Sequence, residues 1–234
     1  MFLVVYHVLI LSLYLYALWF DSNFVEIPYP SKEFENIPFR ARASFLTFWT
    51  MMVQILYFIV ACLNDAIGTN TVTKKPPLIR KIKDHLFSLA FTTAVYVPIT
   101  FWTLYKIDKT YIYPNEEAER QIPNWLNHLM HTSILPIILV ELFISNKNYP
   151  KRKTGLKILL CSAAAYSAYI HYLYFKYGIW PYNFLHLLSW TNKIVMTLFS
   201  GVLGVLYYLI GEKLDSLISK NRREHKHANG IKSH

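Results

Sequence analysis

Residues 1–20 read MFLVVYHVLILSLYLYALWF and contain no Lys, Arg, Asp or Glu. At a rise of about 1.5 Å per residue, a helix of this length crosses the roughly 30 Å of hydrocarbon in a bilayer. A cleaved signal peptide would begin with basic residues and end in small ones, whereas this segment ends in Ala17-Leu18-Trp19-Phe20. The stretch therefore predicts a membrane-spanning helix.

The rest of the chain repeats this pattern. Of its 234 residues, 54% are apolar and only 16% are charged, against about a quarter in soluble proteins. The predicted spans are 1–20, 44–63, 86–105, 123–144, 156–175 and a sixth, which is either 184–210 or a segment that begins only after Lys193 and leaves 180–192 in the membrane interface. The sequence predicts an all-α polytopic membrane protein, with a bundle of six transmembrane helices over residues 1–214 and a basic tail over 215–234.

The distribution of basic residues predicts the orientation. The loops after the second and fourth spans, together with the tail, carry twice as many Lys and Arg as the opposite side of the membrane. By the positive-inside rule, both termini should face the cytosol. Anionic lipid headgroups are the expected partners of these side chains, and they explain the net charge of +10 without nucleic acid.

Two predicted spans carry polar residues at helical spacing. They are Thr47, Thr50 and Gln54 in the second span, and Asn124, His128 and His131 in the fourth. Polar groups in hydrocarbon are costly unless they face the bundle interior, so both faces should point inward. Both spans begin at the non-cytosolic surface in the predicted orientation. We therefore expect Thr47 and His131 in the same leaflet.

Three kinds of chemistry are compatible with these faces. An imidazole can act as general base and activate a threonine hydroxyl for nucleophilic attack. Alternatively, His128 and His131 could bind a metal ion, with His171 or His186 completing the ligand set. The third possibility is structural, with hydrogen bonds that join the helices. The residues alone leave all three open.

Small residues recur at a spacing of four in the fifth and sixth spans. The pairs are Ala163 and Ser167, Ala164 and Ala168, and Ser200 and Gly204. In membrane proteins this spacing is typical of helices that approach closely, so we expect these surfaces to form helix contacts. Pro136 should distort the fourth helix and free the carbonyl of Thr132, close to His131.

Four segments are specific enough to compare with a known family. They are RASFLTFWTMMVQ (42–54), IPNWLNHLMHT (122–132), YPKRKTG (149–155) and GEKL (211–214). In order and spacing they resemble the androgen-induced protein family over about residues 40–214. The resemblance implies a threonine hydrolase that cleaves fatty acid esters of hydroxy fatty acids without a cofactor, with Thr47 as the nucleophile and His131 as the base. It also implies the endoplasmic reticulum or the plasma membrane as its location.

Further roles in such a site are expected for other polar residues. The candidate oxyanion donors are Asn124, Asn127, His128 and Gln54. Arg40 or Arg42 could bind the substrate carboxylate or serve as an ordinary interfacial anchor. Since no Asp or Glu lies in the outer half of a span, a neutral acceptor should support His131.

Two non-enzymatic interpretations stand beside the lipid-ester hydrolase. The first is a multi-pass membrane regulator or lipid-binding scaffold, whose protein partners the sequence does not identify. The second is a small transporter, which is disfavoured because the two halves of the chain share no paired broken helices.

Overall fold

The computed structural model describes residues 2–26, 37, 39, 41–71, 73, 75–113 and 115–231, and all regular structure in these ranges is helical. The long elements are α1 (Phe2–Phe24), α2 (Leu46–Ile67), α3 (Leu78–Ile107), α6 (Ile134–Ile144), α7 (Arg152–Tyr177) and α9 (Trp190–Ile231). The shorter ones are η2 (Arg42–Ser44), η3 (Lys109–Tyr111), α4 (Glu116–Gln121), α5 (Asn124–His128), η4 (Leu129–Ser133) and α8 (Asn183–Leu187).

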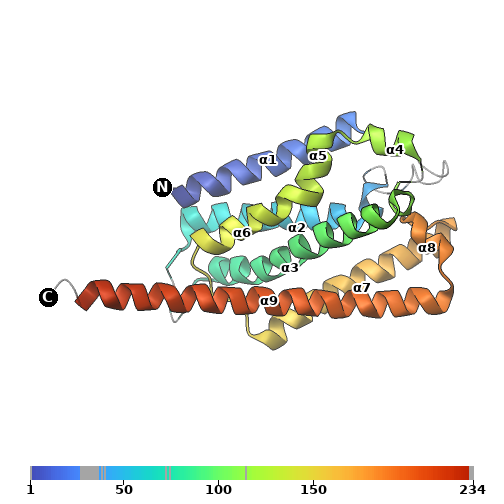
Figure 1. Ribbon diagram of the computed structural model, residues 1–234. Coiled ribbons are helices and arrows are strands. Elements are labelled where there is room, and N and C mark those ends of the chain that lie inside the picture. Colours follow the sequence, from blue (N-terminus) through green and yellow to red (C-terminus); the bar gives the residue numbers. More distant parts are fainter. Residues whose placement is uncertain are drawn as a thin grey trace.

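The bundle confirms the predicted fold class. Six helical segments are long and apolar enough to cross a membrane, with α5, η4 and α6 together forming the fourth. The protein is therefore a multi-pass membrane protein. Figure 1 shows that α1 begins and α9 ends at the same end of the bundle, as an even number of spans requires.

Some predicted boundaries were wrong. Helix α3 begins at Leu78 rather than at residue 86, because Arg80 and Asp84 pair with each other (Nε to Oδ1, 3.0 Å) and can therefore be buried. Helix α9 begins at Trp190, between the two predicted alternatives, so that Lys193 lies in its first turn. It continues without a break to Ile231 (Figure 1), so the predicted basic tail over 215–234 begins within this helix, and the division of the chain at residue 214 stays a prediction.

The start of α9 follows from local chemistry. The Ser189 hydroxyl accepts a hydrogen bond from the backbone N–H of Asn192 at 3.2 Å, as an N-cap serine does. The Ser189 carbonyl accepts from the backbone N–H of Lys193 at 3.0 Å. One of the two predicted alternatives began the sixth span only after Lys193. Because Ser189 caps the helix, α9 begins at Trp190 and includes Lys193.

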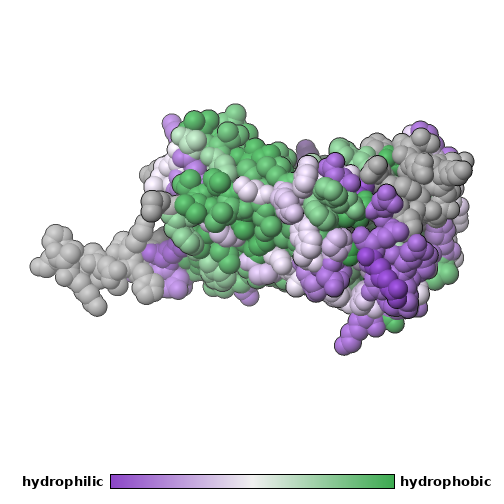
Figure 2. Space-filling view, turned by 90° about the horizontal axis from the view of Figure 1, so that it is seen from above, coloured by the Kyte–Doolittle hydropathy of each residue, from purple (hydrophilic) through white to green (hydrophobic). Residues whose placement is uncertain are grey.

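The centre of the bundle lies between α2, α3 and the fourth span. Fully buried aromatic side chains on α2 and α3, such as Tyr57, Phe58 and Phe87, form its core. Many large apolar side chains on the outer faces of α1, α7 and α9 are exposed, among them Phe2, Phe175 and Leu198. Figure 2 shows the resulting hydrophobic surface on the side of α1, a surface that suits contact with lipid.

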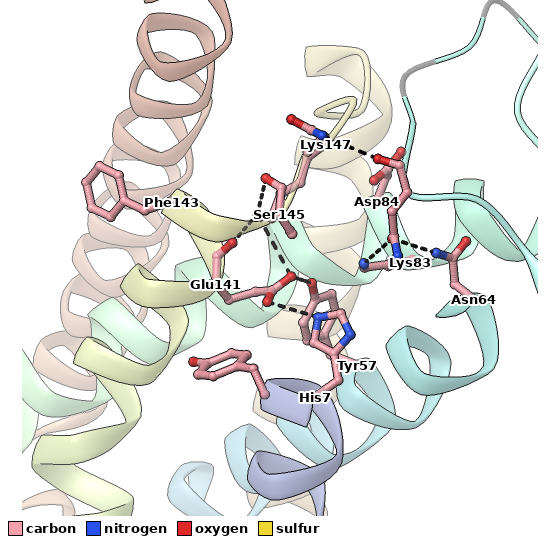
Figure 3. Close-up of polar contacts among 12 residues, drawn as sticks. His7, Tyr57, Asn64, Lys83, Asp84, Glu141, Phe143, Ser145 and Lys147 are labelled. Carbon is pink, nitrogen blue, oxygen red and sulfur yellow. Dashed lines mark hydrogen bonds and ion pairs between the residues drawn. The ribbon is translucent and has the colours of Figure 1, made fainter. Parts of the chain in front are cut away.

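A buried group of charged and polar residues joins several helices of the bundle (Figure 3). We call it the ionic cluster, and its members are His7, Tyr57, Asp65, Arg80, Lys83, Asp84, Glu141 and Lys147. The His7 ring lies between two carboxylates, with Nδ1 2.6 Å from Asp65 Oδ2 and Nε2 3.0 Å from Glu141 Oε2. Glu141 also accepts a hydrogen bond from the Tyr57 hydroxyl at 2.5 Å. The cluster thus ties α1 to α2 and α6.

The lysines of the ionic cluster are also held by specific contacts. Lys147 Nζ donates to the Glu141 carbonyl at 2.6 Å and lies 4.2 Å from the centre of the Phe87 ring. Lys83 Nζ donates to Asn70 Oδ1 at 3.3 Å. Burial lowers the pKa of Lys147, which lies in the loop after α6. The ionic cluster was not predicted from the sequence. Glu141 within the apolar fourth span and His7 within the first span were the signals for it.

Candidate active site in a membrane-buried cavity

Thr47 lies in the first turn of α2, and the chain before it is firmly held. Phe45 precedes the helix in an extended conformation (φ −95°, ψ 135°). The backbone N–H of Leu46 donates to the Tyr182 hydroxyl at 2.8 Å, and the indole of Trp49 donates to the Ala43 carbonyl at 2.7 Å. Because contacts from the α8 region and from η2 fix this turn, the Thr47 side chain has a defined direction.

His131 lies in a distorted part of the fourth span. The helix widens into a π-helix over Leu129–Ser133, which ends three residues before Pro136. Proline has no N–H for the carbonyl of Thr132, which explains why regular α-helical bonding fails here. The indole of Trp102 on α3 donates to the His131 carbonyl at 2.7 Å and to the Thr132 hydroxyl at 3.2 Å. The predicted distortion is present, and α3 stabilises it.

The structure brings Thr47 and His131 together. Thr47 Oγ1 lies 3.1 Å from His131 Nε2. The other ring nitrogen, Nδ1, lies 3.0 Å from the Asn127 carbonyl oxygen and 2.7 Å from Asn127 Oδ1. A backbone carbonyl can only accept, so Nδ1 carries the proton and Nε2 of the neutral ring is an acceptor. Nε2 therefore presents its lone pair to the Thr47 hydroxyl.

Packing fixes the plane of the imidazole. The Phe101 ring stacks on His131 with 3.6 Å between ring centroids and 13° between planes. His131 is 5% exposed. With Asn127 on one nitrogen, Thr47 on the other and Phe101 across one face, the ring has little freedom to rotate. This arrangement holds the two side chains of the pair at hydrogen-bonding distance before any substrate binds.

The pair opens onto a large cavity of about 910 Å³ between α2, α3, α7, α8 and α9. Its wall is mostly apolar, with Thr47, Thr50 and His131 among the polar groups. A volume of this size is in the range of cavities that hold drug-sized or lipid-sized molecules. The geometry therefore combines a hydroxyl, a base and room for an apolar ligand.

Small residues create part of this space. The predicted close-packing residues Ala163, Ala164, Ser167, Ala168, Ser200 and Gly204 line the cavity. A Cβ atom added at the neighbouring Gly201 would meet no atom within 4 Å. The expectation that these residues form helix contacts rather than a ligand cavity was wrong, because their short side chains on α7 and α9 line the cavity and leave part of it unfilled.

The predicted oxyanion candidates do not reach the cavity. Asn124 and His128 are exposed, and the His128 ring bonds to the Thr132 hydroxyl and stacks on Trp102. Gln54 is buried deeper, and its amide donates to the Ala90 carbonyl at 2.9 Å. Asn127 uses its side-chain oxygen to hold His131. None of these four residues lines the cavity, so their predicted role as oxyanion donors has no support in the geometry.

Arg42 is buried and fully engaged. Its guanidinium bonds to the Asp21 carboxylate and to the backbone carbonyls of Asp21 and Val25. Arg42 lines the cavity and fixes the end of α1 against the segment that leads into α2, and its guanidinium bonds to these protein oxygens rather than being free for a substrate carboxylate. Arg40, the other predicted partner, lies outside the described residues.

The predicted metal ligands do not assemble. His131, His171 and His186 line the cavity, but His128 faces Trp102 outside it. Within the described part of the chain, no three His, Cys, Asp or Glu side chains come close enough to hold a metal ion.

Comparison with known proteins places the chain in a family. The family model described as FAR-17a/AIG1-like protein matches residues 2–216. The human androgen-dependent TFPI-regulating protein is 34% identical over 90% of both chains, and the Mesocricetus auratus protein of the same name is 32% identical over the same shares. The human androgen-induced gene 1 protein is 31% identical over 74% of this chain and 76% of its own. No solved structure matches. The chain belongs to the FAR-17a/AIG1-like protein family.

Proposed function

We propose that the protein is an intramembrane hydrolase that cleaves the ester bond of fatty acid esters of hydroxy fatty acids. The observation that carries the proposal is the 3.1 Å contact between Thr47 Oγ1 and His131 Nε2 at the wall of a large apolar cavity. A threonine hydroxyl is not nucleophilic at neutral pH without a base, and the orientation of His131 supplies one. An ester of two fatty acids has the apolar chains that such a cavity accommodates.

The first step is acyl transfer to Thr47. His131 Nε2 accepts the hydroxyl proton while Oγ1 bonds to the ester carbonyl carbon, and the carbon–oxygen bond to the hydroxy fatty acid then breaks. The leaving alkoxide takes the proton from His131 Nε2 and departs as the hydroxy fatty acid. The products of this step are an acyl-threonine and a neutral imidazole.

The second step returns the enzyme to its starting state. His131 Nε2 accepts a proton from water while the water oxygen attacks the acyl carbon, and the bond to Thr47 Oγ1 breaks. Thr47 regains its proton from His131, and the fatty acid is released. Throughout both steps Asn127 accepts from Nδ1, so that the imidazolium formed transiently keeps two hydrogen-bonded oxygens beside it.

The position of Thr47 favours the negative charge of the tetrahedral intermediate. The first-turn peptide N–H groups of an α-helix lack intrahelical partners, and the helix dipole places partial positive charge there. Thr47 belongs to the first turn of the 22-residue helix α2. An oxyanion at the acyl carbon would therefore lie close to the positive end of this helix.

The test is hydrolysis by the purified full-length protein in detergent or lipid. We expect turnover of a hydroxy-fatty-acid ester by the wild type, a loss of at least about a thousandfold for Thr47→Ala and His131→Ala, and partial retention for Thr47→Ser. Thr93→Ala is a matched control, since its hydroxyl bonds to the Leu89 and Ala90 carbonyls of its own helix and not to His131. Turnover by both alanine variants of the pair at the wild-type rate would eliminate the mechanism.

The names of the relatives favour a second candidate function. Four of them are called androgen-dependent TFPI-regulating protein, which describes regulation rather than catalysis. A membrane regulator that binds a lipid in the cavity would require the same fold but no nucleophile. No turnover by a folded wild-type protein, together with lipid binding that persists in Thr47→Ala, would favour this candidate.

A further inference from the structure

Lys193 is a charged side chain in the wall of an apolar cavity. It lies in the first turn of α9, is 8% exposed, and lines the same cavity as Thr47 and His131. Its ammonium donates to the Leu188 carbonyl, one residue before the cap of α9. The indoles of Trp180 and Trp190 lie beside each other next to it, each with its centroid 5.4 Å from Nζ and with 5.9 Å between the two centroids. These neighbours hold the ammonium in place without neutralising its charge.

The cavity supplies no anion for this lysine. Among the lining residues the structure describes, the single acidic side chain is Asp21, and Arg42 already binds it. An ammonium has three N–H donors, of which the Leu188 carbonyl accepts one. A buried charge without a counterion is costly, so the site is favourable for an anion that arrives with the ligand.

The remainder of the wall restricts what that anion can be attached to. The cavity that Lys193 shares with the Thr47–His131 pair has a mainly apolar wall, to which α7 and α9 contribute small side chains. A strongly hydrated inorganic anion would gain little from such a wall, whereas an amphiphile can bury its chains there and place its charged end at Lys193.

We propose that Lys193 binds the free carboxylate of the lipid substrate, so that the cavity selects acidic lipid esters over neutral ones. This assignment takes the substrate class from the proposed ester hydrolysis. In this role Lys193 on α9 takes the place of Arg42, because the Arg42 guanidinium is already paired with the Asp21 carboxylate. With the carboxylate at Lys193 and the ester carbonyl at Thr47, both ends of the hydroxy fatty acid portion are positioned by the protein.

The test compares a hydroxy-fatty-acid ester with its methyl ester, which lacks the charge, as substrates of the purified full-length protein. Lys193→Met should raise KM for the free acid about tenfold to a hundredfold, the range of a charge-assisted hydrogen bond, and leave KM for the methyl ester and both kcat values near wild type. Lys193→Arg should retain the preference. Lys176→Met, which removes an exposed lysine at the end of α7, is the matched control. Partitioning into detergent is common to all variants and cancels in the comparison.

A binding measurement separates this proposal from the hydrolase itself. Oleate and oleyl alcohol are titrated onto Thr47→Ala with and without Lys193→Met, and thermal melts establish that each variant is folded. We expect Lys193→Met to weaken oleate binding about tenfold or more and to leave oleyl alcohol unaffected. Lys193-dependent oleate binding without any wild-type turnover would refute the hydrolase and retain the carboxylate site. The proposal would be overturned if the ratio of KM for the free acid to KM for the methyl ester were the same in Lys193→Met and wild type. It would also be overturned if Thr47→Ala bound oleate with the same affinity with and without Lys193→Met.

Discussion

The protein buries polar groups in two regions that differ in how their hydrogen-bonding capacity is used. In the ionic cluster, carboxylates, imidazole and lysines bind one another, and Glu141 alone receives contacts from His7, Tyr57 and Lys147 (Figure 3). At the Thr47–His131 pair the partners are neutral, and one side faces an open cavity. Apart from Lys147, which lies in the loop after α6, the residues of both regions lie on helices long and apolar enough to cross a membrane.

This difference indicates that the polar residues of the ionic cluster stabilise the structure, whereas those of the Thr47–His131 pair are available for chemistry. Charges that are paired on all sides in a low-dielectric interior lock helices in register, since removing one member leaves the others unpaired. A hydroxyl and an imidazole that face empty space retain the ability to exchange a proton with a bound molecule. Changes in the ionic cluster should therefore affect stability, and changes at the pair should affect chemistry.

The largest effect on stability is expected for Glu141→Ala. This change leaves His7, Tyr57 and Lys147 without their common acceptor, at a cost of about 3–5 kcal/mol and a decrease of about 10 °C in melting temperature. Thermal melts in detergent measure it, with the exposed Glu116→Ala as control.

Thr47→Ala should lose activity with less than about 1 kcal/mol of destabilisation. If Thr47→Ala and Glu141→Ala lowered the melting temperature equally, the distinction between the regions would fail.

Asn127→Ala tests how much the neutral acceptor Asn127 Oδ1 contributes to holding the His131 ring. The backbone carbonyl of residue 127 remains to hold His131 Nδ1, so we expect kcat to decrease about tenfold rather than to vanish. The melting temperature should change little. The equivalent change at Asn124, which is exposed and away from the cavity, is the control. A loss as complete as that of His131→Ala would show that Asn127 does more than orient the ring.

Two glycines, Gly201 on α9 and Gly155 on α7, distinguish the open cavity from a close-packed helix contact. A Cβ at Gly201 meets empty space, whereas a Cβ at Gly155 would lie 2.0 Å from the Tyr208 hydroxyl. We expect Gly201→Leu to fill the cavity and raise KM about tenfold for long-chain esters, with no loss of stability. Gly155→Ala should destabilise the protein without changing KM. Steady-state kinetics with a chain-length series, paired with melts, would expose an opposite pattern.

The smallest effect is expected at the partly exposed contact between Tyr105 and Glu119, near η3. The Tyr105 hydroxyl and then Lys109 lower the pKa of the Glu119 carboxyl. Its contribution to stability is therefore complete above the ordinary glutamate pKa of about 4.3 and is lost as the pH decreases through the lower folded-state value. Glu119→Gln should remove this part of the acid dependence, by less than about 1 kcal/mol. Melts between pH 3 and 6 measure the difference, and a larger change would mean that this pair is more than a surface contact.

The positions of Thr47 and His131 could be predicted because helical periodicity places both on inward faces near one surface. The role of Asn127 could not, since an amide can donate or accept and the sequence does not show which partner it meets. The small residues of α7 and α9 were misinterpreted for a related reason. Short side chains allow either close approach or a void, and the paths of both helices decide between them.

The six spans, the fold class and the two polar helix faces could be predicted from the amino-acid sequence. These follow from apolar length and from the 3.6-residue period, which are local properties of the chain. Only the tertiary structure decided that Asp21 binds Arg42, that Glu141 gathers His7 and Lys147, and that Lys193 faces a cavity without an anion. Those outcomes depend on which helices become neighbours, because a buried charge is defined by partners far away in the chain.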